Sequence, residues 1–400
     1  MTQPLSNAIE LNPPQQSYKR SFWDSLRGDR GIWTIILLLS LISLAAVYSS
    51  SSSLAFREGK TALFFLLKQS GFVVIGLAIL YVCHRIPLGW YRKLAYVGLF
   101  VSIGLLVLVF TPLGKTLNDG TRWLSILGFS FHPAEIAKIA LILYVAKVIE
   151  DRAFDTFEEF VVYLLLPVSV VCLLILWGSI SAGIMLAGTV FIILVVAGIS
   201  SKHLMKAIGI FIVGLTIVVT LSQTTKLFPR VDTAMKRIFT YANVEEKKGD
   251  SFQADQAKIA IASAGIVGKG PGNSTQRYIL PHPYSDFIYA TIVEEYGFLG
   301  GVAVLLLFLW LFYRTYRIAK QCTRTFSSLL AIGLGMLIIF QAMLHICVNV
   351  GLLPVTGQTL PMISLGGTSF VIMSTAFGMI LAVSRTVDKK QAQETMEATS

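Results

Sequence analysis

Ten apolar stretches constrain the fold of this chain more than any other feature of its sequence. A helix that crosses a membrane needs about 20 mostly apolar residues, and each stretch reaches or nearly reaches that length. Helices are expected because the bilayer core offers the backbone no hydrogen-bond partners of its own. The predicted spans are 32–48, 61–83, 94–111, 134–149, 160–177, 180–199, 204–221, 287–313, 326–350 and 362–383.

The composition also indicates a membrane protein. Only 14% of the residues are charged, whereas soluble domains average about 25%. The net charge of +11 is not interpreted as nucleic-acid binding, because most basic residues alternate with apolar spans as a topology signal. Four cysteines lie in or near span ends without the spacing of a metal site or a disulfide framework, so we interpret them as packing residues: Cys83, Cys172, Cys322 and Cys347.

Lys and Arg residues predict the orientation. With the N-terminus inside, the inner segments hold 18 of them and the short outer loops hold four, which predicts that both termini are cytoplasmic. We therefore expect an all-α polytopic membrane protein with about ten transmembrane helices and a large extracytoplasmic loop between the seventh and eighth. Residues 1–30 and 386–400 are expected to be cytoplasmic tails, 31–385 the membrane domain, and 223–286 the large loop.

A carboxylate stands where this loop meets the eighth span. Asp286 lies at the mouth of the span, and Glu294 and Glu295 follow inside the apolar run. A charge in lipid costs at least about 2.5–3.5 kcal/mol, so such residues usually face a protein interior or an aqueous cavity and mark function. We interpret Asp286 as a candidate catalytic base on the outer face. Its alternative role is a helix N-cap, which Ser and Asp favour.

The loop before Asp286 is rich in glycine and reads GKGPGN from Gly268. Beside Lys269, such a loop can hold pyrophosphate through backbone N–H groups, although Gly/Pro clusters also form plain turns. The preceding amphipathic run, 254–267, predicts a helix. That helix either lies along the membrane or packs on the rest of the loop.

A second polar cluster precedes the fourth span. Glu135 and Lys138 are three residues apart, so they share one helix face and can pair. Two interpretations remain open: a self-satisfied ion pair, or a site in which Arg122 and Lys138 approach a phosphate-bearing ligand.

A third stretch, 349–369, is rich in Gly and Pro yet apolar, and it lies on the outer side between two spans. Irregular backbone at membrane depth is tolerated where it is buried or lines a cavity. This favours a re-entrant or broken segment that walls the site over a plain loop.

Together these stretches resemble motifs of the SEDS family (shape, elongation, division and sporulation), the FtsW/RodA polymerases of bacterial cell walls. The resemblance covers nearly the whole chain, from the first span to about Val383. The matching segments are GIVGKGPGNS from Gly265, SDFIYA from Ser285, EEYGFLG from Glu294, GLLPVTG from Gly351, SLGGTS from Ser364, and RW and PAEIAK from Arg122 and Pro133.

The resemblance implies a peptidoglycan glycosyltransferase of the bacterial cytoplasmic membrane that polymerises lipid II, with Asp286 as general base. It also implies a class B penicillin-binding protein and other divisome proteins as partners. No dense Asp/His cluster predicts a metal site within the protein, so we expect Mg²⁺ or Mn²⁺ only with the lipid pyrophosphate. The candidate substrate-binding residues are Arg122, Glu135, Lys138, Lys269, Asn273, Ser274, Glu295 and Ser364.

Two positions depart from the family pattern. Relatives often carry Glu-Pro-Asp-Phe-Gly near the fifth and sixth spans, where this chain reads WGSISAG from Trp177. Relatives also often have a histidine two places before the aspartate, where this chain has Tyr284, with His282 two places further back. A role for that acidic residue, and assistance of Asp286 by a histidine, are therefore in question.

Other functions remain open from the sequence. A transporter of lipid-linked precursors would need polar groups at the midplane of several helices, whereas the polar groups of this chain are predicted on the outer side. A scaffold of a division complex would need no base at Asp286. Within the family, Thr359 and the extended N-terminal tail favour a role in division over one in elongation.

Overall fold

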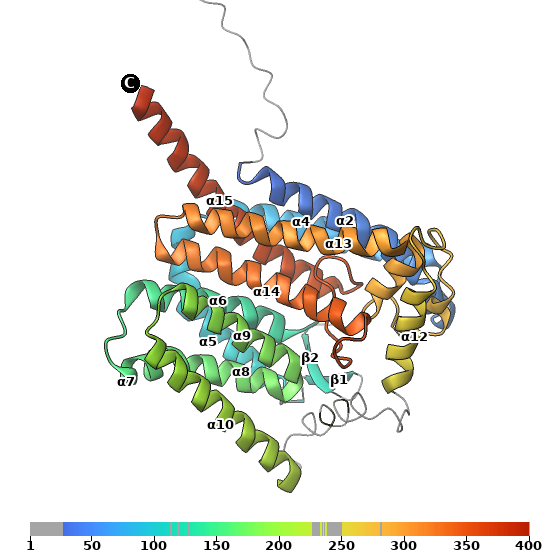
Figure 1. The fold of residues 1–400 in the computed structure, drawn as a ribbon, viewed down its shortest axis with the longest axis horizontal. Helices are drawn as coiled ribbons and strands as arrows, with labels where there is room; N and C mark the ends of the chain where they lie inside the picture. Colours follow the sequence, from blue (N-terminus) through green and yellow to red (C-terminus); the bar gives the residue numbers. More distant parts are fainter. Residues whose placement is uncertain are drawn as a thin grey trace, which may run out of the picture.

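The protein is a bundle of long helices (Figure 1). The structure, a computed structural model, describes residues 27–112, 114–117, 120–126, 129–225, 250–280 and 282–399, together with 233, 235 and 237. Its helices are α2 (Arg30–Ser50), α3 (Ser52–Arg57), α4 (Ala62–Arg85), α5 (Leu88–Leu108), α6 (Pro133–Asp151), α7 (Phe157–Phe160), the π-helix η1 (Val161–Leu165), α8 (Leu166–Gly178), α9 (Ile180–Val196), α10 (Ser201–Thr225), α12 (Asp250–Ala262), the 3-10 helix η2 (Gln276–Tyr278), α13 (Ile288–Gln321), α14 (Thr325–Asn349) and α15 (Gly367–Thr399).

All ten predicted spans fall on helices, which confirms the helical polytopic fold. Within the described part of the chain, eight helical segments are long and apolar enough to cross a membrane, with α7, η1 and α8 forming one of them. The sixth predicted span is α9, which is apolar but shorter, and the fourth is α6, which carries charged residues near both ends. The break between the fifth and sixth spans is at Ser179, whose hydroxyl accepts a hydrogen bond from Ala182 N (3.4 Å) and caps α9.

Two regions extend the sequence prediction. The segment between α5 and α6 forms an antiparallel sheet of β1 (Gly114–Leu117), β2 (Gly120–Ile126) and β3 (Phe129–Phe131), in that order. Arg122 therefore lies on a strand, whereas Glu135 and Lys138 lie on α6. At the other end of the chain, α15 continues to Thr399, so residues 386–399 prolong the last span as helix.

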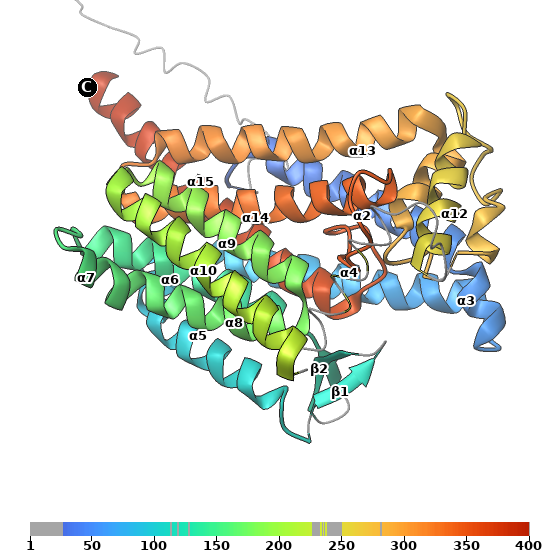
Figure 2. The ribbon, with the colours of Figure 1, turned by 60° about the horizontal axis from the view of Figure 1, so that its bottom comes forward.

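The core lies around α14 and α15. In their most apolar windows 78% and 72% of the residues are buried inside the protein, against 6% for α10. In sequence-distant pairs, α15 packs on α4 and α6 on α14, while α13 also packs on α2. Figure 2 shows α3, α12 and the β1–β2 hairpin at one end of the bundle, and α7 and the end of α15 at the other.

The helix α12 packs on the protein. Its Ala257 and Ala260 are buried with Leu280, Phe287 and Ala290, in a small core beneath the first turn of α13. This arrangement corresponds to the second alternative for the amphipathic run, a helix packed on the rest of the loop.

A kink in α13 holds the Gly-rich loop. At Gly297 the backbone adopts φ 72° and ψ −172°, which interrupts the helical hydrogen bonds and frees backbone groups on both sides. Four bonds to the loop replace the lost ones: Lys269 N to Glu294 O (3.0 Å), Gly270 N to Glu295 O (2.9 Å), Phe298 N to Gly265 O (3.0 Å) and Leu299 N to Ile266 O (3.3 Å). The backbones approach so closely that a Cβ atom on Gly268 would lie 2.3 Å from Glu295 O.

We predict that Gly268→Ala destabilises the protein more than Gly272→Ala. Both glycines have positive φ (+88° and +78°), so both substitutions incur left-handed strain of about 1–2 kcal/mol. Only Gly268 adds a clash with backbone, since nothing lies within 4 Å of a Cβ atom on Gly272. The measurement is the thermal unfolding midpoint of each variant in detergent, and equal shifts would contradict this account of the loop.

Candidate functional site

The segment 282–287 carries Asp286 to the start of α13. Asp286 is half-buried, and its backbone N donates to His282 O (3.2 Å). The N-cap of α13 is Phe287, which makes no side-chain capping bond. The interpretation of Asp286 as the N-cap is therefore wrong, because the helix begins one residue later than that role requires.

A buried amide fastens this segment to α14. Asn349 is fully buried, and its Nδ2 donates to Asp286 O (3.1 Å) and to His345 O (2.8 Å). Its Oδ1 accepts from Ala290 N (3.0 Å), which lies in the first turn of α13. One side chain thus satisfies backbone groups on both sides of Phe287 and holds the Asp286 backbone against the core.

The non-helical stretch between α14 and α15 braces the same segment. Ser364 Oγ donates to Ser285 O (2.8 Å) and accepts from Leu360 N (2.8 Å). Leu365 N donates to Tyr284 O (2.9 Å). The apolar Gly/Pro-rich stretch therefore lies directly against the residues around Asp286, and Ser364 contacts this segment.

Two strained residues flank the site. Among the described residues, the positive-φ residues other than glycine are His282 (φ 58°) and Met362 (φ 60°). Such conformations cost about 1–3 kcal/mol each and cluster at functional sites. His282 Nδ1 lies 3.0 Å from the Tyr284 hydroxyl, so the histidine that departs from the family position is linked to the tyrosine that stands there.

Charges surround Tyr284. Burial raises the pKa of its hydroxyl, the charges of Asp286 and Glu58 raise it further, and Arg57 lowers it. The phenol therefore keeps its proton at neutral pH, and its pKa is affected by the charges of Arg57 and Glu58 at the end of α3. Arg57 is thus a cation that acts on Tyr284, two residues before Asp286.

Glu294 ties the Gly-rich loop to α13. Its carboxylate is fully buried, and Oε1 accepts from Lys269 Nζ (2.6 Å), Thr275 N (3.1 Å) and Thr275 Oγ1 (2.9 Å). Oε2 accepts from the Ser274 hydroxyl and from Gln276 N (3.3 Å). Lys269 and Ser274 are both candidate substrate ligands, and both donate to Glu294. Glu294, which is not one of the candidate residues, thus holds the loop against α13.

Glu295 faces the end of the first span. It accepts a hydrogen bond from the Ser49 hydroxyl, and Arg277 NH1 lies 3.9 Å from its Oε1. Arg277 also donates to Ser49 O (3.2 Å). The serine run from Ser49 to Ser53 is the polar sequence feature at the end of the first span that indicates this contact.

The second polar cluster is buried. Lys138 is fully buried, and its Nζ donates to Glu135 Oε1 and to Gln341 Oε1, both at 2.8 Å. Glu135 and Lys138 therefore form the expected ion pair, which α14 completes. Within the described residues the other carboxylate oxygen of Glu135 is buried without a hydrogen-bond donor, which leaves one acceptor open in this cluster.

Gln341 connects this pair to the broken stretch. Its Nε2 donates to Thr359 O (3.1 Å), and the neighbouring Gln358 O lies 2.7 Å from His345 Nδ1. Gln358 Nε2 donates to Ser179 Oγ (3.3 Å). Polar contacts thus run from α6 through α14 to the stretch that supports Asp286.

Two candidates stand apart from these networks. Arg122 lies on β2, and its side chain is outside the described part of the structure. Asn273 is exposed and donates from Nδ2 to Lys269 O (3.1 Å). Their roles as substrate ligands stay predictions.

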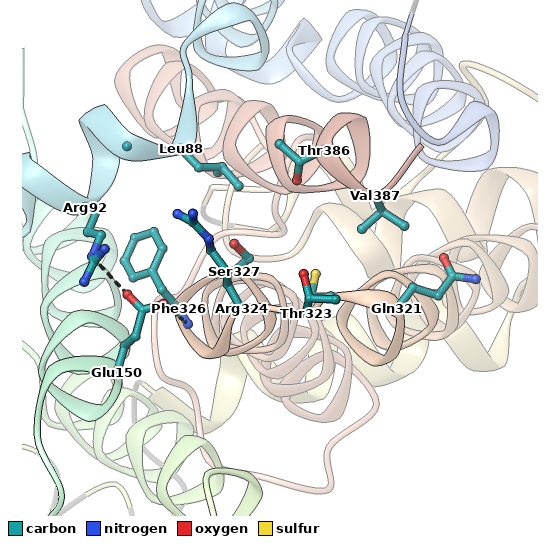
Figure 3. A pocket seen from close by; sticks show the side chains of 12 residues that line it. Leu88, Arg92, Glu150, Gln321, Thr323, Arg324, Phe326, Ser327, Thr386 and Val387 are labelled. Carbon is teal, nitrogen blue, oxygen red and sulfur yellow. Dashed lines mark hydrogen bonds and ion pairs between the residues drawn. The ribbon is translucent and has the colours of Figure 1, made fainter. Parts of the chain in front are cut away.

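No metal cage is formed by the residues that the structure describes, since these contain no group of three or more His, Cys, Asp or Glu side chains placed to hold an ion. A cavity of about 260 Å³ lies far from Asp286, beside the turn between α13 and α14 (Figure 3).

Comparison with known proteins gives a consistent result. The model of the cell cycle protein family FtsW/RodA/SpoVE matches residues 29–389. Stage V sporulation protein E of Bacillus subtilis is 34% identical over 88% of this chain and 95% of its own length. A probable peptidoglycan glycosyltransferase FtsW of Geobacter metallireducens is 31% identical over 92% of this chain and 97% of its own length.

Solved structures share the fold. A chain from a peptidoglycan synthase complex, described as coordinating polymerization and crosslinking, has a TM-score of 0.72 at 24% identity and covers 90% of this chain and 98% of its own. The rod shape determining protein RodA of Thermus thermophilus has a TM-score of 0.66 at 23% identity, with coverage of 90% and 97%.

We predict that Glu294→Ala opens the Gly-rich loop. The change leaves Lys269 without its carboxylate partner and removes the acceptor for the Thr275 N–H. We therefore expect the free energy of unfolding to fall by about 3 kcal/mol. Hydrogen exchange of residues 269–277 should rise many-fold. The control is Glu58→Ala, which breaks an exposed pair with Lys60 (3.0 Å) and should cost less than about 1 kcal/mol. Unchanged exchange at 269–277 would contradict the assignment.

Proposed function

Because the chain belongs to the FtsW/RodA/SpoVE family of cell cycle proteins, we propose that it is a peptidoglycan glycosyltransferase. It polymerises lipid II into glycan strands on the outer face of the bacterial cytoplasmic membrane. The observation that carries the proposal is the fixed Asp286 segment, held by Asn349 and Ser364 where the large loop meets a membrane span.

The proposed reaction is a displacement at the anomeric carbon of a lipid-linked sugar. Asp286 takes the proton from the 4-hydroxyl of an N-acetylglucosamine as that oxygen bonds to the anomeric carbon. The bond from this carbon to the pyrophosphate breaks, and its electron pair leaves on undecaprenyl pyrophosphate. A carboxylate suits this step because it must accept a single proton at a positioned oxygen.

Cations near the pyrophosphate stabilise the leaving group by spreading its charge. Arg57 and Arg122 are the proposed contacts, with Arg57 placed near Tyr284 by its effect on that hydroxyl. Lys269 already donates to Glu294 and Thr275, so its first role is to shape the loop. A Mg²⁺ or Mn²⁺ ion would arrive with the pyrophosphate, which supplies the oxygen ligands.

The proposed setting is division. Relatives at 31–33% identity are named as probable FtsW enzymes, and the excess of inner Lys and Arg favours cytoplasmic termini. A class B penicillin-binding protein is the proposed partner, since the structural neighbour with the same fold comes from a complex that couples polymerization to crosslinking.

We predict that Asp286→Asn abolishes glycan synthesis while folding and partner binding persist, because the amide cannot accept the proton. The assay uses purified protein with its penicillin-binding partner, labelled lipid II and Mg²⁺ or Mn²⁺, and detects glycan chains on a gel. The matched control is Asp255→Asn in α12, which changes a carboxylate of the same loop. Chains from Asp286→Asn would remove Asp286 from the base role. No chains from the wild type would favour transport or scaffolding.

We predict that Asn349→Leu lowers kcat and leaves KM for lipid II nearly unchanged. Leucine has a similar size but leaves Asp286 O and Ala290 N without their hydrogen-bond partner. Each unsatisfied buried group costs about 1–3 kcal/mol of stability. The control is Thr189→Val, which removes a buried hydroxyl bonded within its own helix to Met185 O (2.9 Å). A rise in KM alone would show that Asn349 does not position the base.

A further inference from the structure

The cavity beside the turn between α13 and α14 lies at the far end of α13 from Asp286. It measures about 260 Å³ and is bounded by the start of α5, the end of α6, the turn between α13 and α14, and α15. One water molecule occupies about 30 Å³, so the cavity can take a much larger group. Its walls combine the apolar side chains of Leu88, Phe326 and Val387 with the hydroxyls of Thr323 and Ser327 (Figure 3).

The cavity offers one uncompensated cation. Arg92 is neutralised, because its Nε lies 2.9 Å from Glu150 Oε2 and its NH2 lies 2.8 Å from Asp151 Oδ1. Glu150 also accepts from Phe326 N (3.4 Å). Figure 3 shows the Arg324 guanidinium extended into the cavity, and within the described residues it has neither an ion pair nor a side-chain hydrogen bond.

The field at this position favours an anion. Arg324 is also the N-cap residue of α14, and its side chain makes no capping bond. The positive end of the dipole of this 25-residue helix therefore adds to the guanidinium charge. An arginine fork matches the oxygens of a phosphate group.

Neighbouring residues place the cavity at the depth of lipid headgroups. Trp and Tyr are enriched at this level of a membrane, together with Lys and Arg. Three such pairs lie at the same end of the bundle as the cavity, near the end of α4, the start of α5 and the end of α13: Arg85 over Tyr81 (5.5 Å), Lys93 over Trp90 (5.7 Å) and Arg317 over Tyr313 (5.9 Å). The orientation from the positive-inside rule makes this the cytoplasmic side.

We propose that this cavity binds the phosphate-bearing headgroup of an anionic lipid of the inner leaflet. Basic pockets between membrane helices on the cytoplasmic side bind such headgroups. The Arg324 guanidinium holds the phosphate, and the apolar wall of Leu88, Phe326 and Val387 contacts the glycerol and the first methylenes. The inference rests on the proposed membrane orientation and is independent of the role of Asp286.

The test compares lipids on the full-length protein. Purified protein in detergent receives phosphatidylglycerol, phosphatidylcholine or inorganic phosphate at equal concentration, and native mass spectrometry measures the bound fraction. We expect preferential retention of phosphatidylglycerol. Arg324→Gln should weaken it about fivefold, the effect of one cation at a membrane surface. Arg324→Lys should restore most of the affinity. The control is Lys202→Gln, an exposed cation at the start of α10, which should change nothing.

Four results would overturn the proposal. Equal retention of both lipids would exclude selection of the anionic headgroup, and equal loss in Lys202→Gln would indicate diffuse surface charge. Binding of free phosphate with the affinity of the lipid would indicate an inorganic anion site. An acidic peptide that binds in an Arg324-dependent manner while the two lipids bind alike would indicate a protein partner in this cavity.

Discussion

The docking of residues 265–270 onto the kink of α13 is the interaction on which the outer end of the molecule depends. A helix that breaks at Gly297 exposes backbone groups near a membrane surface, where unpaired groups are costly. The loop satisfies them by backbone pairing, and this pairing needs glycine on both sides. The carboxylate of Glu294, in the same turn of α13, accepts further hydrogen bonds from the loop. The helix break and the shape of the loop therefore depend on each other.

Buried polar contacts also connect distant parts of the bundle to the Asp286 segment. They pass from Lys138 through Gln341 to the stretch after α14, and then through Ser364 to the Asp286 segment. Networks of this kind stabilise a unique arrangement when every member is paired, and they destabilise it when one partner is lost. Under the proposed function, the carboxylate of Asp286 benefits because the protein core sets the position of its backbone.

The two ends of α13 carry different chemistry. At its first turn, strained backbone at His282 and Met362 flanks Asp286, the proposed base. At its last turn, Arg324 and the first turn of α14 line the cavity that we propose as a phosphate site. A lipid bound at the inner end would fix the turn between α13 and α14, and α14 carries Asn349 at its opposite end.

The sequence by itself determined the ten helical spans, because runs of about 20 apolar residues have one stable form in a bilayer. It also singled out Asp286 and the pairing of Glu135 with Lys138, since a carboxylate at a span mouth and an i, i+3 ion pair are local patterns. Only the tertiary structure decided the partners that come from distant segments. Asn349 and Asp286 are 63 residues apart, and no local pattern encodes that contact. The sheet of β1–β3 and the role of Glu294 were likewise decided by packing, because each depends on groups that meet only when the bundle closes.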